Sequence, residues 1–230
     1  MKSFLVIGVG RYGRHLCKKL YELGYDVMAV DRNEDCIEPV LPYTLNSMIG
    51  DSTKKDFIKS IGVSNFDTCF VAIGDDFQTS LETTSLLSEC GAKYVVSRAS
   101  RDTQAKFLLR NGANEVVYPE RQLAEWAAIR YSSNNISNYI ELPGENSIFE
   151  CKVPKSWEGK TVLELDIRKK YKVNIMAIKR EDSWYMTITP QIKFEKDQDI
   201  LVYGANKHLE KFLHFDSSNF TTEEEAKDND

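Results

Sequence analysis

The sequence predicts an α/β protein in which a Rossmann-like, doubly wound parallel sheet of six strands precedes a small α+β lobe. Three observations support this prediction. The first half alternates short apolar runs with helical patterns, as in a parallel sheet covered on both faces. The motif Gly8–Gly13 (GVGRYG) follows the first apolar run and opens the first helical pattern. Beyond residue 135 the pattern changes to strands, two of which are linked as a hairpin.

The Rossmann-type lobe is expected over residues 1–134. Its six strands are expected at Ser3–Ile7, Asp26–Val30, Ser47–Ile49, Thr68–Ile73, Tyr94–Ser97 and Glu115–Tyr118. Helices are expected over Arg14–Leu23, Thr53–Ile61, Phe77–Cys90, Asp102–Asn111 and from Pro119 to about Ser133. Right-handed crossovers bring the carboxyl ends of parallel strands to one rim, so the residues after these ends should converge on one crevice.

The second lobe is expected over residues 135–218, after a break at Ser132–Asn135. Its strands are expected at Ser147–Val153, Asn174–Arg180, Trp184–Thr189 and Asp199–Tyr203, with a helix near Thr161–Tyr171. Residues 219–230 are expected to form an acidic disordered tail, because they are rich in carboxylates and poor in apolar side chains.

The composition excludes several classes of function. The net charge of −5 argues against a general nucleic-acid binder, and we predict no nucleic-acid partner. No apolar run approaches the ~18 residues that a membrane helix needs, and no signal peptide is recognised. The 5 cysteines are scattered without a CxxC pair, which suits a reducing cytosol and gives no metal-site pattern. We therefore expect a cytoplasmic protein.

The glycine motif predicts a nucleotide site, because it lies between an apolar strand and a helix. Gly8 allows a tight turn, Gly10 lets the backbone approach a pyrophosphate, and Gly13 permits close packing of the helix on the strand. The free N–H groups at the helix N-terminus then favour phosphate. The alternative is a vestigial turn that only packs.

Four residues are expected near the ribose and the base. Asp31 ends the second strand, where its carboxylate can accept bonds from both ribose hydroxyls and would repel a 2′-phosphate. Arg32 beside it could soften that repulsion. Asp51 and Ser52 follow the third strand, where they either read the adenine edge or cap the next helix. For Asp31 the alternative is a surface carboxylate that begins a loop.

Two arginines are expected near the phosphates. Arg11 lies inside the glycine loop and Arg98 follows the fifth strand, although either could be a solvated surface residue. Tyr12 in the loop, and Ile73 and Gly74 at the end of the fourth strand, complete the candidate nucleotide-binding set.

Catalytic constellations are absent from the sequence. The 3 histidines are His15, His208 and His214, and no catalytic triad, carboxylate dyad or Lys-Tyr pair has a plausible spacing. We therefore predict a nucleotide-binding protein and no enzyme. A small NAD-dependent oxidoreductase and a structural oligomerisation module with an empty crevice remain as alternatives.

The chain resembles the RCK family (regulator of potassium conductance, also called KTN or TrkA-type), and most of all the cytosolic subunits of Ktr-type potassium uptake systems. The arginine within GxGRxG and the Gly-Ala-Asn-x-Val-x-x-Pro-Glu run are more specific than the glycines alone. The likeness covers residues 2–215. It is carried by residues 4–35, 49–76, 111–120, 147–180 and 199–212.

This resemblance implies a gating subunit at the inner face of the membrane. Such subunits form homodimers that assemble into an octameric ring beneath an integral-membrane potassium channel or transporter. ATP and ADP compete for the crevice, with NAD or NADH as an alternative here, and the exchange changes the shape of the ring and the potassium flux. Arg11 would reach the terminal phosphate, and Glu120 would help to bind Mg²⁺ or Ca²⁺. The alternative for Glu120 is a residue of a helix first turn, favoured by the helix dipole.

The resemblance also implies a second ligand, cyclic di-AMP, between two C-terminal lobes. Arg168 would face a phosphate, Asn174 a base or a phosphate, and Ile167, Ile175 and Pro190 would stack on adenine. The alternative is an apolar dimer interface without a ligand.

Overall fold

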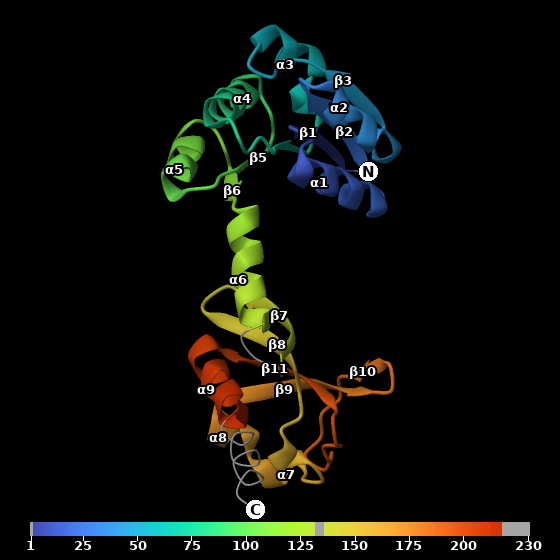
Figure 1. The fold of residues 1–230 in the computed structure, drawn as a ribbon, viewed down its shortest axis with the longest axis vertical. Helices are drawn as coiled ribbons and strands as arrows, with labels where there is room; N and C mark the ends of the chain where they lie inside the picture. The colour runs from blue at the N-terminus through green and yellow to red at the C-terminus, as the bar shows by residue number, and fades with distance from the viewer. Residues whose placement is uncertain (1, 132–135, 218–230) are drawn as a thin grey trace, which may run out of the picture. The chain divides into compact units, whose positions relative to one another are not determined.

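The computed structural model describes residues 2–131 and 136–217 (Figure 1). The chain forms two compact units, Met1–Leu123 and Ala124–Asp230. The expected lobe boundary at 134/135 and the expected tail over 219–230 lie outside the described residues. No helix in the described part of the chain is long and apolar enough to cross a membrane.

The N-terminal unit contains the predicted six-stranded parallel sheet, in the order β3-β2-β1-β4-β5-β6, which confirms the doubly wound fold. Its strands are β1 (Ser3–Ile7), β2 (Asp26–Asp31), β3 (Asn46–Ile49), β4 (Thr68–Val71), β5 (Val95–Arg98) and β6 (Glu115–Val117). Strand β1 lies at the centre between β2 and β4, and four of its five residues are buried. Continuous burial of β1 and β2 explains why these two strands read as apolar runs.

Five helices over residues 11–131 match predicted positions to within a few residues. They are α1 (Arg11–Glu22), α3 (Lys55–Ile61), α4 (Phe77–Glu89), α5 (Asp102–Arg110) and α6 (Pro119–Tyr131). The sequence did not predict α2 (Glu34–Ile37) or the 3₁₀ helices η1 (Glu38–Tyr43) and η2 (Val63–Asn65). Helix α2 is one turn long, so its start depends on a local cap. The Asn33 side chain accepts a hydrogen bond from the Asp35 backbone N–H at 3.0 Å.

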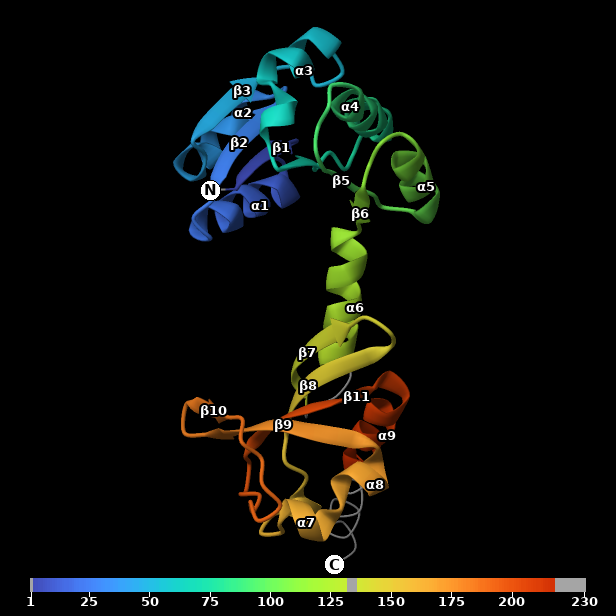
Figure 2. The same cartoon turned by 180° about the vertical axis from the view of Figure 1, so that it is seen from behind.

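The sheet has an apolar core on each face, and β1 contributes to both. Leu5 and Ile7 point to the face covered by α3 and α4, whereas Phe4 and Val6 point to the face covered by α1 and α2 (Figures 1 and 2). Alternate strand residues reach opposite faces, so one strand can supply both cores. Each fully buried aliphatic side chain contributes about 1.5–3 kcal/mol to stability.

The C-terminal unit is built on a five-stranded antiparallel sheet in the order β10-β9-β11-β8-β7. Its strands are β7 (Ile136–Leu142), β8 (Asn146–Lys152), β9 (Val173–Arg180), β10 (Ser183–Tyr185) and β11 (Asp199–Ala205). The predicted hairpin of β9 and β10 is confirmed. Strand β7 was missed, because its polar residues and a register shift between Ile136 and Asn138 hide its alternation. Strand β10 is shorter than predicted, and Met186 beyond it is 64% exposed.

The helices of this unit are η3 (Lys155–Trp157), α7 (Val162–Leu165), α8 (Ile167–Tyr171) and α9 (Asn206–Ser217). The sequence predicted one helix over Thr161–Tyr171, which is wrong: the chain breaks at Asp166, whose φ is +43°. A left-handed residue cannot continue a right-handed helix. Trp157 packs against Tyr171, Phe194 and Phe212 with ring centroids 5.4–5.5 Å away, at the centre of the core.

Candidate functional site

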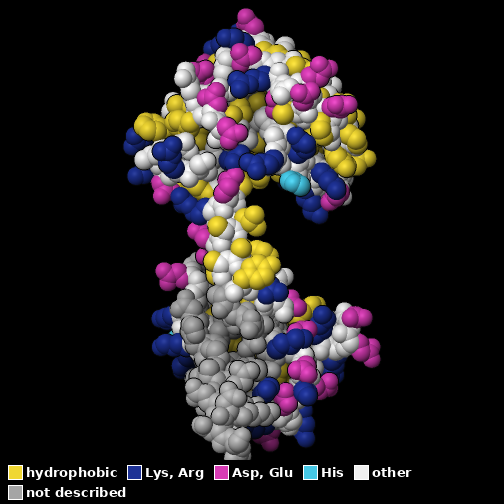
Figure 3. Space-filling view, viewed as in Figure 1, with side chains coloured by type: hydrophobic (Ala, Val, Ile, Leu, Met, Phe, Trp, Pro, Cys, Tyr) yellow, Lys and Arg dark blue, Asp and Glu magenta, His cyan; other side chains and the backbone are white. Residues whose placement is uncertain are grey.

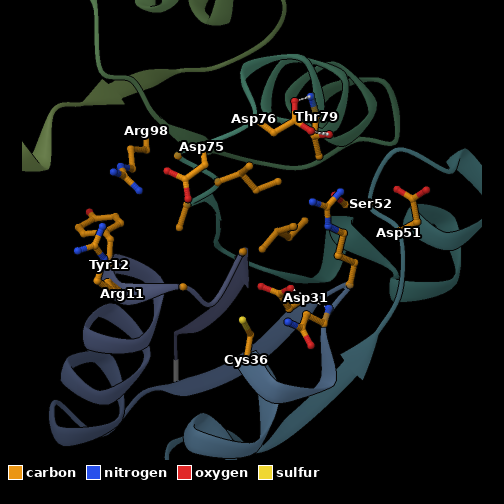
Figure 4. A pocket seen from close by; sticks show the side chains of 18 of the residues that line it. Arg11, Tyr12, Asp31, Cys36, Asp51, Ser52, Asp75, Asp76, Thr79 and Arg98 are labelled. Carbon is orange, nitrogen blue, oxygen red and sulfur yellow. Dashed lines mark hydrogen bonds between the residues drawn. The ribbon is translucent and has the colours of Figure 1, made fainter.

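A cavity of about 320 Å³ lies at the carboxyl ends of the parallel strands in the N-terminal unit. Every residue of the predicted nucleotide-binding set lines it except Gly13, so the convergence expected from topology is present. Figure 4 shows Arg11, Tyr12 and Arg98 at one end of the cavity, and Asp51 and Ser52 at the other. The lining residues are Ile7, Gly8, Gly10, Arg11, Tyr12, Asp31, Arg32, Asn33, Cys36, Gly50, Asp51, Ser52, Ala72, Ile73, Gly74, Asp75, Asp76, Thr79, Arg98 and Glu120.

Each glycine of the loop has a separate steric reason to be glycine. Gly8 has φ +88°, a backbone conformation that side chains disfavour, and a Cβ there would lie 2.8 Å from the Ile73 side chain. A Cβ on Gly13 would overlap the backbone carbonyl oxygen of Gly8, so only glycine lets α1 pack on the end of β1. Gly10 has open space beside it, which leaves room for a ligand to approach the backbone.

Asp31 joins the glycine loop to the end of β2. Its Oδ2 accepts a hydrogen bond from the Val9 backbone N–H at 2.8 Å, and its Oδ1 accepts one from the Asn33 backbone N–H at 2.9 Å. A carboxylate offers about four acceptor positions, so two remain for ligand hydroxyls. The bond to Val9 was not predicted, and it makes the loop conformation depend on this carboxylate.

The interpretation of Asp51 and Ser52 as helix caps is wrong. Helix α3 begins two residues later than expected, after Lys54, and its N-cap makes no side-chain hydrogen bond. Asp51 instead accepts bonds from the Thr53 backbone N–H and hydroxyl, which hold the pKa of the Asp51 carboxyl below its usual range. The Ser52 hydroxyl is 2.7 Å from the buried Thr83 hydroxyl and is thereby fixed in the cavity wall.

An ion pair between Arg98 and Glu120 crosses the end of the cavity opposite Asp51. The Arg98 guanidinium covers Gly74, where a Cβ would overlap it, and its side chain is only 17% exposed. Its Nε has no hydrogen-bond partner among the described residues. Glu120 is 64% exposed in the first turn of α6. Burial raises the pKa of the neighbouring Tyr12 hydroxyl; Glu120 adds to this effect and Arg98 opposes it.

The cavity also contains polar residues that the sequence analysis missed. Asp75 and Asp76 follow Gly74 at the end of β4, so the strand-end argument that found Asp51 could have found them. Asp76 caps α4, accepting bonds from the Thr79 backbone N–H at 3.1 Å and hydroxyl at 2.6 Å, which lower the pKa of the Asp76 carboxyl. Cys36, on α2, lies beside Asp31 at the end of β2 (Figure 4). No sequence pattern predicted that Cys36 would line the cavity.

Glu120 does not belong to a complete metal site in the described part of the chain. No group of three or more His, Cys, Asp or Glu side chains is arranged to hold a metal ion there. Mg²⁺ at nucleotide sites takes one or two carboxylates together with phosphate oxygens, so a single carboxylate here fits a cation carried by a nucleotide.

The residues expected to bind a second ligand lie on α8, on β9 and in a turn of the C-terminal unit. Arg168 is exposed on α8, Asn174 and Ile175 are half-buried on β9, and the exposed Pro190 accepts a bond from the Leu163 N–H. Ile167 is 3% exposed within the core, so the single chain offers no face of it for stacking on a base.

Comparison with known proteins shows the family of this chain. Residues 4–119 match the TrkA-N domain and residues 148–215 match the TrkA-C domain. The chain is 37% identical to Ktr system potassium uptake protein C of Bacillus subtilis (strain 168), covering 92% of this chain and 96% of that protein. The chain belongs to the TrkA family of RCK proteins. Ktr system potassium uptake protein A of the same organism is 32% identical, covering 92% of this chain and 95% of that protein.

Solved RCK structures share the fold of this TrkA-family chain. The GsuK channel matches with a TM-score of 0.64 and 18% identity, over 92% of this chain and 39% of the channel chain. The GsuK channel bound to NAD matches with a TM-score of 0.50 and 20% identity, over 95% of this chain and 39% of that chain. The predicted likeness to RCK proteins is therefore confirmed in both sequence and fold.

Proposed function

We propose that this TrkA-family chain is the cytosolic regulatory subunit of a Ktr- or Trk-type potassium uptake system, and that an adenine nucleotide in the N-terminal cavity is its signal. The observation that carries the proposal is the cavity itself. It unites a phosphate-type glycine loop, three arginines and the Asp31 carboxylate at the carboxyl edge of the sheet, where nucleotides bind in such folds. The Ktr relatives supply the transport context.

The arrangement of charges gives the nucleotide an orientation. The phosphates would lie at the N-terminus of α1, between Arg11 and Arg98, where backbone N–H groups and two cations favour anions. The ribose would lie over Asp31 and the base toward Asp51 and Ser52. Asp31 disfavours a 2′-phosphate, so ATP, ADP, NAD and NADH are the candidates and NADP is not.

Arg98 and Glu120 couple the bound nucleotide to the start of α6 in this proposal. A phosphate that approaches Arg98 competes with Glu120 for the guanidinium, and a divalent cation carried by the phosphates attracts the released carboxylate. Glu120 begins α6, so exchange of ADP for ATP would change the contacts at the start of that helix. We propose that homodimers in an octameric ring transmit this change to the membrane subunit.

The same cavity favours regulation over catalysis. Its lining contains no histidine and no lysine, so the proton-transfer groups that most dehydrogenases use are missing from the described lining. We propose that the chain is not an enzyme. In the C-terminal unit, cyclic di-AMP remains a proposed second ligand, with Arg168, Asn174, Ile175 and Pro190 as its candidate contacts.

Potassium uptake by a transport-deficient cell tests this function. A Ktr-type membrane subunit is expressed alone, with this chain, or with the chain carrying Asp31→Ala. We expect uptake to rise with the unaltered chain and to lose its dependence on cellular ATP with the variant. Equal uptake in all three strains would contradict the proposal.

Glu120→Gln is expected to change the cation dependence of nucleotide binding. Without divalent cations, ATP affinity should rise about 5-fold, because a carboxylate near the phosphates is removed. Mg²⁺ should increase the ATP affinity of the unaltered chain, and this increase should be absent in the variant. Calorimetric titration with and without Mg²⁺ measures both effects. The stability change should stay below about 1 kcal/mol, because the Arg98–Glu120 pair is largely exposed on the Glu120 side.

Glu125→Gln provides the matched control for this variant. Glu125 lies on the same helix, is exposed and is outside the cavity. If both variants bind ATP with the same Mg²⁺ dependence as the unaltered chain, Glu120 is not a cation ligand.

The reactivity of Cys36 is expected to report occupancy of the cavity. Burial and the Asp31 carboxylate raise the pKa of the Cys36 thiol, so its alkylation is expected to be slow at pH 7 and faster at pH 9. Bound ADP should slow it at least 10-fold, by covering the thiol. Cys17 and Cys69, with pKa values raised to about 12, should stay unreactive. Mass spectrometry of the alkylated peptides reports each cysteine separately. Cys90 lies outside the cavity, so ADP should not protect it from alkylation.

A further inference from the structure

Helices α8 and α9 present a basic surface in the C-terminal unit. The two helices lie side by side (Figures 1 and 2), and Tyr171 of α8 packs edge-on against Phe212 of α9 with ring centroids 5.8 Å apart. The cationic residues of this surface are all exposed. They are Arg168, Lys169 and Lys170 on α8, Lys172 just after it, and Lys207 and Lys211 on α9. We call these six residues the basic surface.

The basic surface contrasts with the negative charge of the chain as a whole, which is −5. Asp166 lies 3.6 Å from Lys169, but both side chains are more than half exposed, so water and salt screen the pair. The Glu164 carboxylate accepts bonds from Thr161 and is committed to the start of α7. Figure 3 shows Lys and Arg side chains along the flank of the C-terminal unit on which Figure 1 places α9.

The chemistry of the surface narrows the class of partner. Five of its six cations are lysines, which act as hydrated point charges, whereas specific phosphate recognition usually relies on the planar guanidinium of arginine. Its aromatic neighbours Tyr171 and Phe212 pack inward against Trp157, so they offer no platform for stacked bases. Diffuse attraction to an extended sheet of negative charge fits these properties best.

We propose that the basic surface docks on an anionic phospholipid bilayer. Clusters of four to eight Lys and Arg residues bind such membranes through long-range attraction to acidic headgroups. The inference takes from the proposed function only the location of the chain beside a membrane. Each lysine near the bilayer strengthens binding about fivefold, so the cluster would hold the C-terminal unit at the membrane even without a protein contact.

Vesicle sedimentation of the full chain tests this inference. The chain is mixed with vesicles of phosphatidylcholine alone, or of phosphatidylcholine with phosphatidylglycerol, at low and high salt. We expect binding only to the anionic vesicles, and weaker binding at high salt. Replacing Lys169, Lys170 and Lys172 with glutamine should weaken binding roughly a hundredfold, which is three factors of about five. Arg168 is kept, because it is a candidate contact of the proposed second ligand.

A charge-matched control separates the basic surface from net charge. Lys18, Lys59 and Lys106 are exposed lysines of the N-terminal unit, and their replacement by glutamine removes the same charge. This control should bind anionic vesicles within about twofold of the unaltered chain. Equal binding by the two triple variants, binding to neutral vesicles, or no binding would overturn the inference. Tighter binding to single-stranded DNA than to anionic vesicles would also overturn it.

Nucleotide titration keeps this inference distinct from the proposed function. The Lys169, Lys170 and Lys172 variant should bind ADP as the unaltered chain does, because these residues lie outside the cavity. If the unaltered chain binds anionic vesicles but no nucleotide, the proposed function fails and the membrane inference stands. If it binds nucleotide but no vesicles, only the membrane inference fails.

Discussion

Replacing Gly13 with alanine is expected to destabilise the N-terminal unit by about 3 kcal/mol or more, a large part of the stability of a domain of this size. The added Cβ would overlap the carbonyl oxygen of Gly8. The Gly8 backbone is held in place because its N–H donates to the Val30 carbonyl oxygen at 2.8 Å, and the first turn of α1 is held by the bond from the Arg14 N–H to the Gly10 carbonyl oxygen at 3.0 Å. Since neither the Gly8 backbone nor the first turn of α1 can move without a cost in free energy, α1 would have to separate from β1.

Unfolding followed by two signals shows whether the loss is confined to the N-terminal unit. The 3 tryptophans, Trp126, Trp157 and Trp184, all belong to the Ala124–Asp230 unit, so their fluorescence reports mainly that unit. Circular dichroism reports the helices of both units. In the Gly13→Ala variant, circular dichroism should show an earlier transition from the destabilised N-terminal unit, whereas the fluorescence transition should stay unchanged. Unchanged curves by both signals would show that the contact between Gly13 and Gly8 does not limit packing.

Gly10→Ala is the matched control, and it has a different expected effect. Gly10 has φ −63° and nothing near the position of a Cβ, so the unfolding free energy should change by less than about 0.5 kcal/mol. Nucleotide affinity should nevertheless fall about 10-fold or more, because the methyl group occupies the space that a phosphate would enter. A stable Gly10→Ala variant with unchanged affinity would mean that the loop does not hold phosphate.

Asp31→Ala is expected to weaken adenine-nucleotide binding about 30- to 150-fold, as the loss of charged hydrogen bonds worth about 2–3 kcal/mol implies. The variant also leaves the Val9 and Asn33 N–H groups without their acceptor, so the unfolding free energy should fall by about 1–2 kcal/mol. Affinity is measured by titration at a temperature where circular dichroism shows the variant folded. Asp31→Asn should retain part of the loop contact and weaken the discrimination against NADP.

Asp35→Ala controls for the removal of one negative charge near the cavity. Asp35 is exposed on α2, outside the cavity lining. Its replacement should leave nucleotide affinity within about twofold. Similar losses of affinity for Asp35→Ala and Asp31→Ala would indicate a general effect of charge and no specific contact with ribose.

The sequence predicted the features of the fold that depend on local patterns. Continuous apolar runs mark strands buried on both faces, and the glycine loop fixes where β1 ends and α1 begins. From these, topology alone brings Asp31, Asp51 and Arg98 to one rim, and the cavity is found there. Their separation along the chain is no obstacle, because every parallel strand ends on the same side.

Features that depend on tertiary partners could not be predicted in the same way. Strand β7 alternates weakly and is defined by its pairing with β8. The helix breaks at Asp166 because its φ is positive, and no pattern in the flanking sequence predicts that angle. The sequence placed Arg98 and Glu120 near the phosphates separately, but their ion pair needs the β5 end and the α6 start to meet. The side-chain contacts of Asp51 and Ser52 likewise depend on neighbours that the sequence does not identify.

Calorimetric titration of the purified chain with ATP, ADP, NAD and NADP tests the central claim most directly. The claim is that the N-terminal cavity is an adenine-nucleotide site and that Asp31 selects against a 2′-phosphate. The account predicts one site per chain with micromolar affinity for at least one of ATP, ADP and NAD, and binding of NADP at least 10-fold weaker than that of NAD. Absence of binding by all four nucleotides, or equal affinity for NAD and NADP, would contradict it.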